Sequence, residues 1–230
     1  MKKTVIFDFD GVILDSFPNQ YKWFQHISQR LGRTFMHSLE EFKSDYVEPV
    51  YPNMYELLGL DWKKNKSFIW GEYTEYMRNA KVGLVPGIAD VLEDVRGLSL
   101  EMAIASSNTS DIILKHLDSN RLGHYFRAVI TKEDLAEPGR KEPRLKPDPC
   151  CLYITLKQLR VSPENAIYIG DQTSDIVAAR RVKEKMGKEM MTLAVTYGYA
   201  RKAKLMAYNP DFIADRPEGI VPEIKKAFSL

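Results

Sequence analysis

Short apolar runs recur along the chain, each bounded by polar or turn-forming residues. Five such runs cover residues 4–7, 100–105, 128–131, 166–169 and 192–196. Each has the length of a strand, and strands without polar alternation belong in a sheet buried on both faces. Helical patterns separate the last four runs, with examples at residues 88–96, 110–117, 149–159 and 174–185. This alternation implies right-handed crossovers, so the sequence predicts an α/β fold with a doubly wound, Rossmann-like parallel sheet.

One interval departs from this alternation of strands and helices. Between the first run and residue 100 the chain is far longer than one crossover, and residues 17–80 carry helical patterns throughout. Apolar side chains recur there at helical spacing, at Phe17, Tyr21, Phe24, Ile27 and Leu31. Such a segment needs a small core of its own, so we expect an inserted α-helical cap of residues 16–83. The core domain would then comprise residues 1–15 and 84–230. The alternative is a set of extra helices packed flat on the sheet.

Charge and composition narrow the function. The chain has 230 residues, with 33 basic and 31 acidic side chains and a net charge of +2. A dedicated nucleic-acid binder usually has a larger, clustered basic excess, so we expect no nucleic-acid partner. No stretch approaches the ~18 consecutive apolar residues of a membrane helix, so we expect no membrane partner and a cytoplasmic location. The adjacent cysteines Cys150 and Cys151 are not expected to pair, and the sequence carries no signal of oligomeric state.

Acidic side chains follow two of the apolar runs at the point where each run ends. Asp8 and Asp10 come directly after the first run, and Asp171 follows the run that ends at residue 169, with Asp175 four residues further on. Because parallel strands present their carboxyl ends at one edge of a sheet, Asp8, Asp10 and Asp171 would form an oxygen site suited to Mg²⁺. Taken singly, the first pair fits a turn, Asp171 a helix cap and Asp175 a charge at a helix N-terminus.

Two further elements could hold a phosphate. Ser106, Ser107 and Asn108 follow the apolar run at 100–105, where hydroxyls and backbone amides can bind phosphate oxygens. Lys146 lies between this segment and the second acidic pair, and the prolines that follow it fix the backbone ahead of a helix. The alternatives are a helix cap for the serines and an ordinary surface lysine for Lys146.

In this order, the four motifs together resemble the haloacid dehalogenase superfamily. The motifs are the Asp-Phe-Asp-Gly-Val segment from Asp8, the Ser-Ser-Asn segment from Ser106, the Lys-Pro-Asp-Pro segment from Lys146 and Gly-Asp-x-x-x-Asp ending at Asp175. The resemblance is narrower to the phosphatase branch that has a helical cap after the first motif, as in phosphoglycolate-phosphatase-like proteins. It implies a hydrolase that acts on a small phosphorylated metabolite.

The resemblance also implies a role for each motif residue. Asp8 would be the nucleophile that forms an aspartyl-phosphate, and Asp10 the general acid and base. Mg²⁺ would be bound by the Asp8 carboxylate, the Asp10 backbone carbonyl and the Asp171 carboxylate. Asp175 would bind the metal through water or orient a neighbouring group.

The phosphate-binding residues follow from the same resemblance. Ser106, the Ser107 amide and Lys146 would hold the phosphoryl group during its transfer. Lys146 would also keep Asp8 ionised beside its acidic neighbours.

Three other functions stay open. A sugar-phosphate mutase of the beta-phosphoglucomutase kind usually has a histidine early in the cap, and residues 17–21 contain none. A phosphoacceptor module that resembles a response-regulator receiver uses similar side chains. Receivers, however, are shorter, lack a cap and place the phosphorylated Asp on a later strand. A member of the family that binds without catalysis would be expected to lack part of the motif set.

The loop before Lys146 is longer than such proteins usually have. Residues 136–145 include Arg140, Lys141 and Arg144. One hypothesis is that one of these side chains contacts a second anionic group of the substrate. The alternative is a solvated basic loop.

Overall fold

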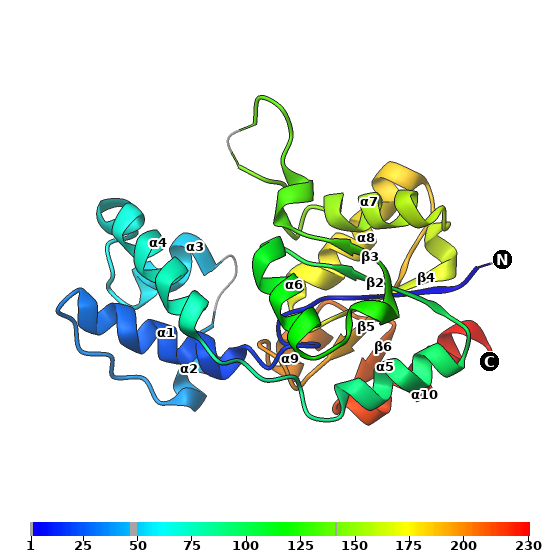
Figure 1. Ribbon diagram of the computed structural model, residues 1–230, viewed down its shortest axis with the longest axis horizontal. Coiled ribbons are helices and arrows are strands. Elements are labelled where there is room, and N and C mark those ends of the chain that lie inside the picture. Colours follow the sequence, from blue (N-terminus) through cyan, green and yellow to red (C-terminus); the bar gives the residue numbers. More distant parts are fainter. Residues whose placement is uncertain (1, 47–49, 141) are drawn as a thin grey trace. The chain divides into compact units, whose positions relative to one another are not determined.

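A six-stranded parallel sheet forms the centre of the fold, with strand order β3-β2-β1-β4-β5-β6 (Figure 1). The structure is a computed structural model that describes residues 2–46, 50–140 and 142–230. The strands are β1 (Thr4–Phe7), β2 (Glu101–Ala105), β3 (Phe126–Ile130), β4 (Ala166–Gly170), β5 (Met191–Val195) and β6 (Phe212–Ala214). Every residue of β1 and of β4 is buried, as expected for strands that are covered on both faces.

Helices cover both faces of this sheet. The helices of this part of the chain are α5 (Ile88–Gly97), α6 (Ser110–Ser119), α7 (Cys150–Leu159), α8 (Thr173–Met186), α9 (Lys202–Met206) and α10 (Ile220–Phe228). Helices α7 and α8 pack on one face, where α7 contacts β2 and β3 and α8 contacts β4 and β5. On the other face α10 packs against β5, β6 and α5 (Figure 1). The predicted doubly wound α/β fold is therefore confirmed.

The C-terminal elements β6, α9 and α10 were not predicted from the sequence. Strand β6 has three residues, and two of them are only partly buried because the strand lies at the edge of the sheet. A run this short and this exposed carries little of the apolar signal by which the other strands were predicted.

The chain divides into two compact units. One unit comprises Met1–Leu14 with Leu84–Leu230, and the other comprises Asp15–Gly83. The second unit contains α1 (Phe17–Arg30), α2 (Leu39–Asp45), α3 (Val50–Leu57) and α4 (Trp62–Asn79). Its core is aromatic: Trp23, Phe24 and Tyr55 are fully buried, and the Trp23 indole donates a hydrogen bond to the Tyr55 hydroxyl at 2.9 Å. Burial of these large side chains gives this segment an apolar core within its own residues.

Register in the sheet sets the height at which each strand ends. Phe7 of β1 lies beside Ile104 of β2 and Ile169 of β4. Residues that follow these three positions therefore emerge at one edge of the sheet, and the Asp8 amide extends the ladder by donating to the Ile169 carbonyl at 2.8 Å. This edge carries the motif residues.

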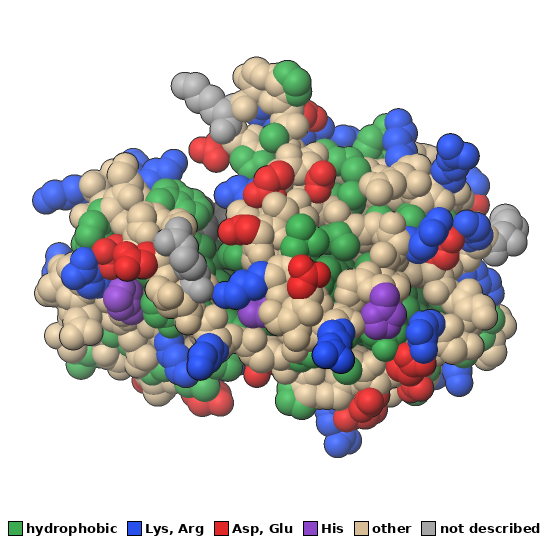
Figure 2. Space-filling model, in the orientation of Figure 1, with side chains coloured by type: hydrophobic (Ala, Val, Ile, Leu, Met, Phe, Trp, Pro, Cys, Tyr) green, Lys and Arg blue, Asp and Glu red, His purple; other side chains and the backbone are tan. Residues whose placement is uncertain are grey.

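In the described residues, no helix combines the length and the apolar character needed to cross a membrane. On the face seen in Figure 2, basic and acidic side chains are interspersed, in keeping with their near-equal numbers, 33 and 31.

Candidate active site

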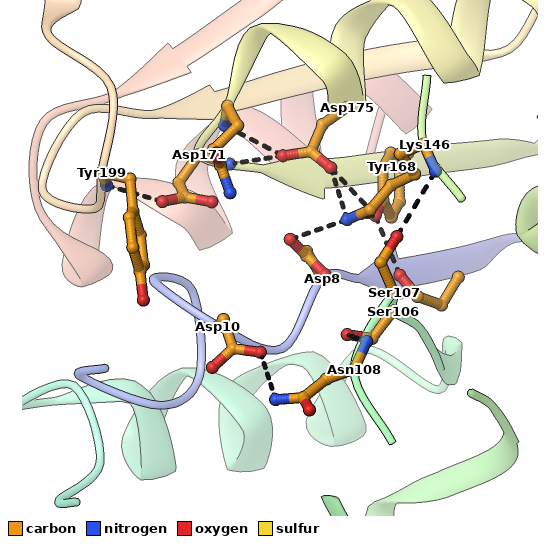
Figure 3. Close-up of polar contacts among 12 residues, drawn as sticks. Asp8, Asp10, Ser106, Ser107, Asn108, Lys146, Tyr168, Asp171, Asp175 and Tyr199 are labelled. Carbon is orange, nitrogen blue, oxygen red and sulfur yellow. Dashed lines mark hydrogen bonds and ion pairs between the residues drawn. The ribbon is translucent and has the colours of Figure 1, made fainter. Parts of the chain in front are cut away.

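Three buried carboxylates meet at the carboxyl edge of the sheet. Asp8 follows β1, Asp171 follows β4 and Asp175 lies in the first turn of α8 (Figure 3). One oxygen from each of these side chains lies within 4.8 Å of the others, and each residue is at most 3% exposed. Ionised carboxylates at this separation repel one another strongly in a buried site unless cations or protons compensate.

Lys146 supplies part of that compensation. Its Nζ lies 2.8 Å from Asp8 Oδ2 and 2.6 Å from Asp175 Oδ1. Burial lowers the pKa of Lys146, but Asp175 and Asp8 more than offset this effect, so that its pKa lies well above the usual value. The side chain therefore stays a cation. One ammonium group still leaves the three carboxylates short of positive charge.

The pKa values of the acids show the same imbalance. Burial raises the pKa of Asp8 to about 7, although Lys146 opposes the rise. Burial, with Asp175 and Asp8 as further causes, raises the pKa of Asp171 well above its usual range. A bound cation would remove this penalty, because it favours the ionised form of each carboxylate.

Asp171 has one oxygen that fits a metal ligand. Its Oδ2 accepts a 2.6 Å hydrogen bond from the Tyr199 amide, whereas its buried Oδ1 has no hydrogen-bond partner among the described residues. An unpaired buried carboxylate oxygen is costly, and a hard cation such as Mg²⁺ would satisfy it. The residues present therefore fit a Mg²⁺ site. The Asp10 side chain is not one of the three carboxylates in this cluster. Binding of a metal by the Asp10 backbone carbonyl stays a prediction.

Both carboxylate oxygens of Asp175 accept hydrogen bonds from other groups of the protein. Its Oδ2 accepts from the backbone amides of Asp171 at 3.1 Å and Gln172 at 2.9 Å, and its Oδ1 binds Lys146. These bonds fix the first turn of α8 to the strand end before it. The arrangement suits a group that orients Lys146.

Tyr168, on the buried strand β4, was not predicted as a site residue. Its hydroxyl accepts from Lys146 Nζ at 3.0 Å and donates to the Ala105 carbonyl at 2.9 Å. The hydroxyl thus connects the lysine to the end of β2. The only hint in the sequence is a tyrosine within an otherwise apolar strand.

The Ser-Ser-Asn segment lies beside the acids (Figure 3). Ser106 is buried and its Oγ accepts from the Asn108 amide at 3.1 Å, while Ser107 Oγ accepts from the Lys146 amide at 3.4 Å. Asn108 Nδ2 donates to Asp10 Oδ2 at 2.7 Å, and this contact was not predicted from the sequence. The structure thus brings Asp8, Asp10, Ser106, Ser107, Lys146, Asp171 and Asp175 to one edge of the sheet (Figure 3).

The arginines of the long loop at residues 136–145 pair with nearby acids. The Arg144 guanidinium donates to Asp148 at 2.9 Å and to Glu137 at 3.0 Å, and Arg140 lies 3.8 Å from Glu137. Lys141 lies outside the described residues. Arg144 is therefore paired with one acid in the loop and one beyond it, and a contact of these side chains with substrate stays a prediction.

The two cysteines are buried side chains that pack in the core. Cys150 and Cys151 begin α7 and are buried, and burial raises the pKa of the Cys151 thiol to about 12. A thiol with so high a pKa is almost entirely protonated at neutral pH and is a poor nucleophile.

Comparison with known proteins identifies the family of this chain. Residues 5–187 match the family described as haloacid dehalogenase-like hydrolase, and the chain belongs to this family. It is similar to a phosphoglycolate phosphatase of Pseudomonas fluorescens, with 24% identity over 96% of this chain and 79% of the relative. It is also similar to pyrophosphatase PpaX of Bacillus cereus, with 26% identity over 95% of this chain and 94% of the relative.

A solved structure supports the fold. The crystal structure of a haloacid dehalogenase-like hydrolase from Bacteroides fragilis superposes with a TM-score of 0.79, at 24% identity, over 96% of this chain and all of the other. At this identity the likeness concerns the fold. The chemistry therefore has to be argued from the residues of this chain.

Proposed function

We propose that the protein is a Mg²⁺-dependent phosphatase that hydrolyses a small phosphomonoester through an aspartyl-phosphate on Asp8. The observation that carries this proposal is the environment of the Asp8 carboxylate. It lies 2.8 Å from the Lys146 ammonium and beside Asp171, whose buried Oδ1 lacks a partner among the described residues. A carboxylate that lies between a cation and a residue suited to bind a metal can attack an anionic phosphoryl group.

The proposed metal would be held by Asp8, Asp171 and the backbone carbonyl of Asp10. When bound, Mg²⁺ supplies neutralisation of the negative charge on the acids and on the phosphoryl oxygens. The protein contributes the remaining contacts. The Ser106 hydroxyl, the Ser107 amide and the Lys146 ammonium would hold the phosphoryl oxygens and align the phosphorus with Asp8.

Two displacements then complete the reaction. In the first, an Asp8 oxygen bonds to phosphorus as the ester P–O bond breaks, and Asp10 gives a proton to the departing alkoxide. In the second, water bonds to phosphorus and gives its proton to Asp10, while the bond between phosphorus and Asp8 breaks. Inorganic phosphate leaves, and both aspartates return to their starting state.

For the substrate we propose a small phosphorylated metabolite of the phosphoglycolate kind. The proposal is supported by relatives named as a phosphoglycolate phosphatase and a pyrophosphatase, since both names refer to a small phosphorylated substrate. We further propose that the helical unit Asp15–Gly83 acts as a cap that governs the access of substrate and water. A mutase of the beta-phosphoglucomutase kind is the alternative activity, and it is disfavoured by the absence of a histidine from residues 17–21.

Phosphate release from p-nitrophenyl phosphate tests the proposal. We expect turnover with Mg²⁺ that is lost in EDTA, restored by added Mg²⁺, and lost in Asp8→Asn. The matched control is Asp118→Asn, since Asp118 lies exposed on α6, and this variant should keep wild-type activity.

A panel of phosphorylated metabolites ranked by kcat/KM would then identify the substrate. The proposal is wrong if the wild-type protein turns over neither p-nitrophenyl phosphate nor any member of the panel. Interconversion of sugar phosphates without net phosphate release would instead favour the mutase.

A further inference from the structure

Asn108 connects the end of β2 to the proposed general acid. Its Nδ2 donates a hydrogen bond of 2.7 Å to Asp10 Oδ2, and both residues are partly buried. Asp10 follows β1 in a turn, and Asn108 follows the neighbouring strand β2 (Figure 3). The bond therefore joins two segments that are 98 residues apart in the sequence.

Local hydrogen bonds fix the orientation of the Asn108 amide. Its Oδ1 accepts from the Thr109 backbone amide at 2.8 Å, and its own backbone amide donates to Ser106 Oγ at 3.1 Å. Because Oδ1 must face a donor, the amide nitrogen must face Asp10. Asn108 can therefore present only N–H groups to the Asp10 carboxyl.

We propose that Asn108 is a positioning residue for Asp10, an inference that rests on the proposed phosphatase function. When Asp10 is protonated, the carbonyl oxygen of its carboxyl group is the better acceptor for the Asn108 N–H. The bond to Oδ2 thus places the acidic proton on Oδ1. It also restricts rotation of the side chain, so the proton is delivered from one place.

The effect should be confined to the step that uses this proton. In the first displacement the ester P–O bond breaks and the proton moves from Asp10 Oδ1 to the leaving oxygen. An alkyl phosphate needs this proton, because an alkoxide is a poor leaving group. A p-nitrophenyl phosphate needs it far less, because p-nitrophenolate is stable without protonation.

Two variants separate positioning from a structural role. Asn108→Asp keeps an oxygen that can accept from Thr109 but replaces the N–H groups that face Asp10. Asn108→Ala removes both contacts. A role confined to the turn at Thr109 predicts that Ala is harmful and Asp is harmless, whereas positioning of Asp10 predicts that both are harmful.

The measurement is kcat/KM at pH 8 with Mg²⁺, since this constant covers the steps up to the first displacement. For Asn108→Asp we expect a loss of about 10- to 100-fold with an alkyl phosphate, a part of the effect typical of a general acid. With p-nitrophenyl phosphate we expect a loss of about threefold or less, because this reaction scarcely uses the acid. Asn120→Asp, at the end of α6, is the matched control and should leave both constants unchanged.

Thermal melting and circular dichroism establish that each variant is folded. Equal losses with both substrates, or wild-type kcat/KM in the Asp variant, would overturn the positioning role. A wild-type protein that hydrolyses neither substrate would overturn the proposed function itself, and the inference with it.

Discussion

Glycines give the buried Asp171 side chain the room it occupies. A Cβ atom on Gly11 would lie 2.1 Å from Asp171 Oδ2, and one on Gly198 would lie 2.2 Å from the same oxygen. Gly11 also has a φ of +74°, which favours glycine for backbone reasons. Since Asp171 is fully buried and bonded to the Tyr199 amide, it cannot move aside without losing that bond. Both glycines are therefore needed for the carboxylate to sit where it does.

Gly198→Ala tests this requirement. The added methyl should displace the Asp171 carboxylate and weaken binding of Mg²⁺ by about tenfold or more, because a metal ligand must be held close to its productive position. Calorimetric titration of the metal-free protein with Mg²⁺ measures the change in affinity. Gly123→Ala is the control, because nothing lies within 4 Å of a Cβ at that position. Unchanged affinity in Gly198→Ala would contradict the steric account.

The site residues that could be predicted from the sequence are mainly those at the ends of strands. Asp8, Ser106 and Asp171 each follow an apolar strand, and parallel neighbours in register bring such residues to one edge. The contacts of Tyr168 with Lys146 and of Asn108 with Asp10 were missed. They depend on side-chain directions across the sheet, and no periodicity in the sequence encodes these. Strand β6 was missed because a three-residue edge strand carries too little apolar pattern.

Arg144 joins the long loop to the start of α7. Its guanidinium bridges Glu137 and Asp148, and Asp148 in turn accepts from the Cys150 amide at the first turn of that helix. The residues that these bonds join lie on both sides of Lys146 in the sequence. The loop thereby holds the segment that delivers the lysine to the site.

For Arg144→Ala we therefore expect a lower kcat, by about two- to tenfold, as the lysine loses support. The KM should change equally little for substrates with one and with two anionic groups, because the guanidinium is already paired. Steady-state kinetics on both kinds of substrate provide the measurement. A rise in KM confined to the dianionic substrates would show instead that Arg144 binds substrate. Arg160→Ala, beyond the C-terminus of α7, serves as the control.

A second prediction concerns Cys150 and Cys151, the first two residues of helix α7. Both thiols are buried, and burial raises the pKa of Cys151 to about 12. A thiol reagent such as DTNB should therefore react slowly with the native protein and rapidly with both cysteines in guanidinium chloride. Alanine at each position should leave kcat/KM within about threefold of wild type, because neither thiol takes part in the proposed chemistry. Rapid labelling of the native protein with loss of activity would contradict this placement.

At the scale of the whole molecule, the net charge of +2 conceals a local excess of negative charge. Asp8, Asp171 and Asp175 are buried around one lysine, and the raised pKa values of Asp8 and Asp171 record the cost. A protein selected only for stability would not keep this arrangement. The acids are retained, in our interpretation, because the metal and the phosphoryl group complete the site.

The melting temperature of the Asp171→Asn variant, compared with that of the wild-type protein, tests this interpretation. In EDTA the variant should melt higher than the wild-type protein, because the amide removes one of three mutually repelling buried carboxylates. A stabilisation of 1 kcal/mol corresponds to about 2–4 °C for a protein of this size.

With Mg²⁺ at 100 times its Kd the order should reverse, because binding adds about 2.7 kcal/mol to the stability of the wild-type protein. The variant, which lacks the ligand oxygen, should gain little. Calorimetric scans at pH 8, with EDTA and with Mg²⁺, make the measurement, and Asp118→Asn should behave as wild type in both. If Mg²⁺ raises the melting temperature of the Asp171→Asn protein as much as that of the wild type, then Asp171 is not a ligand of the metal.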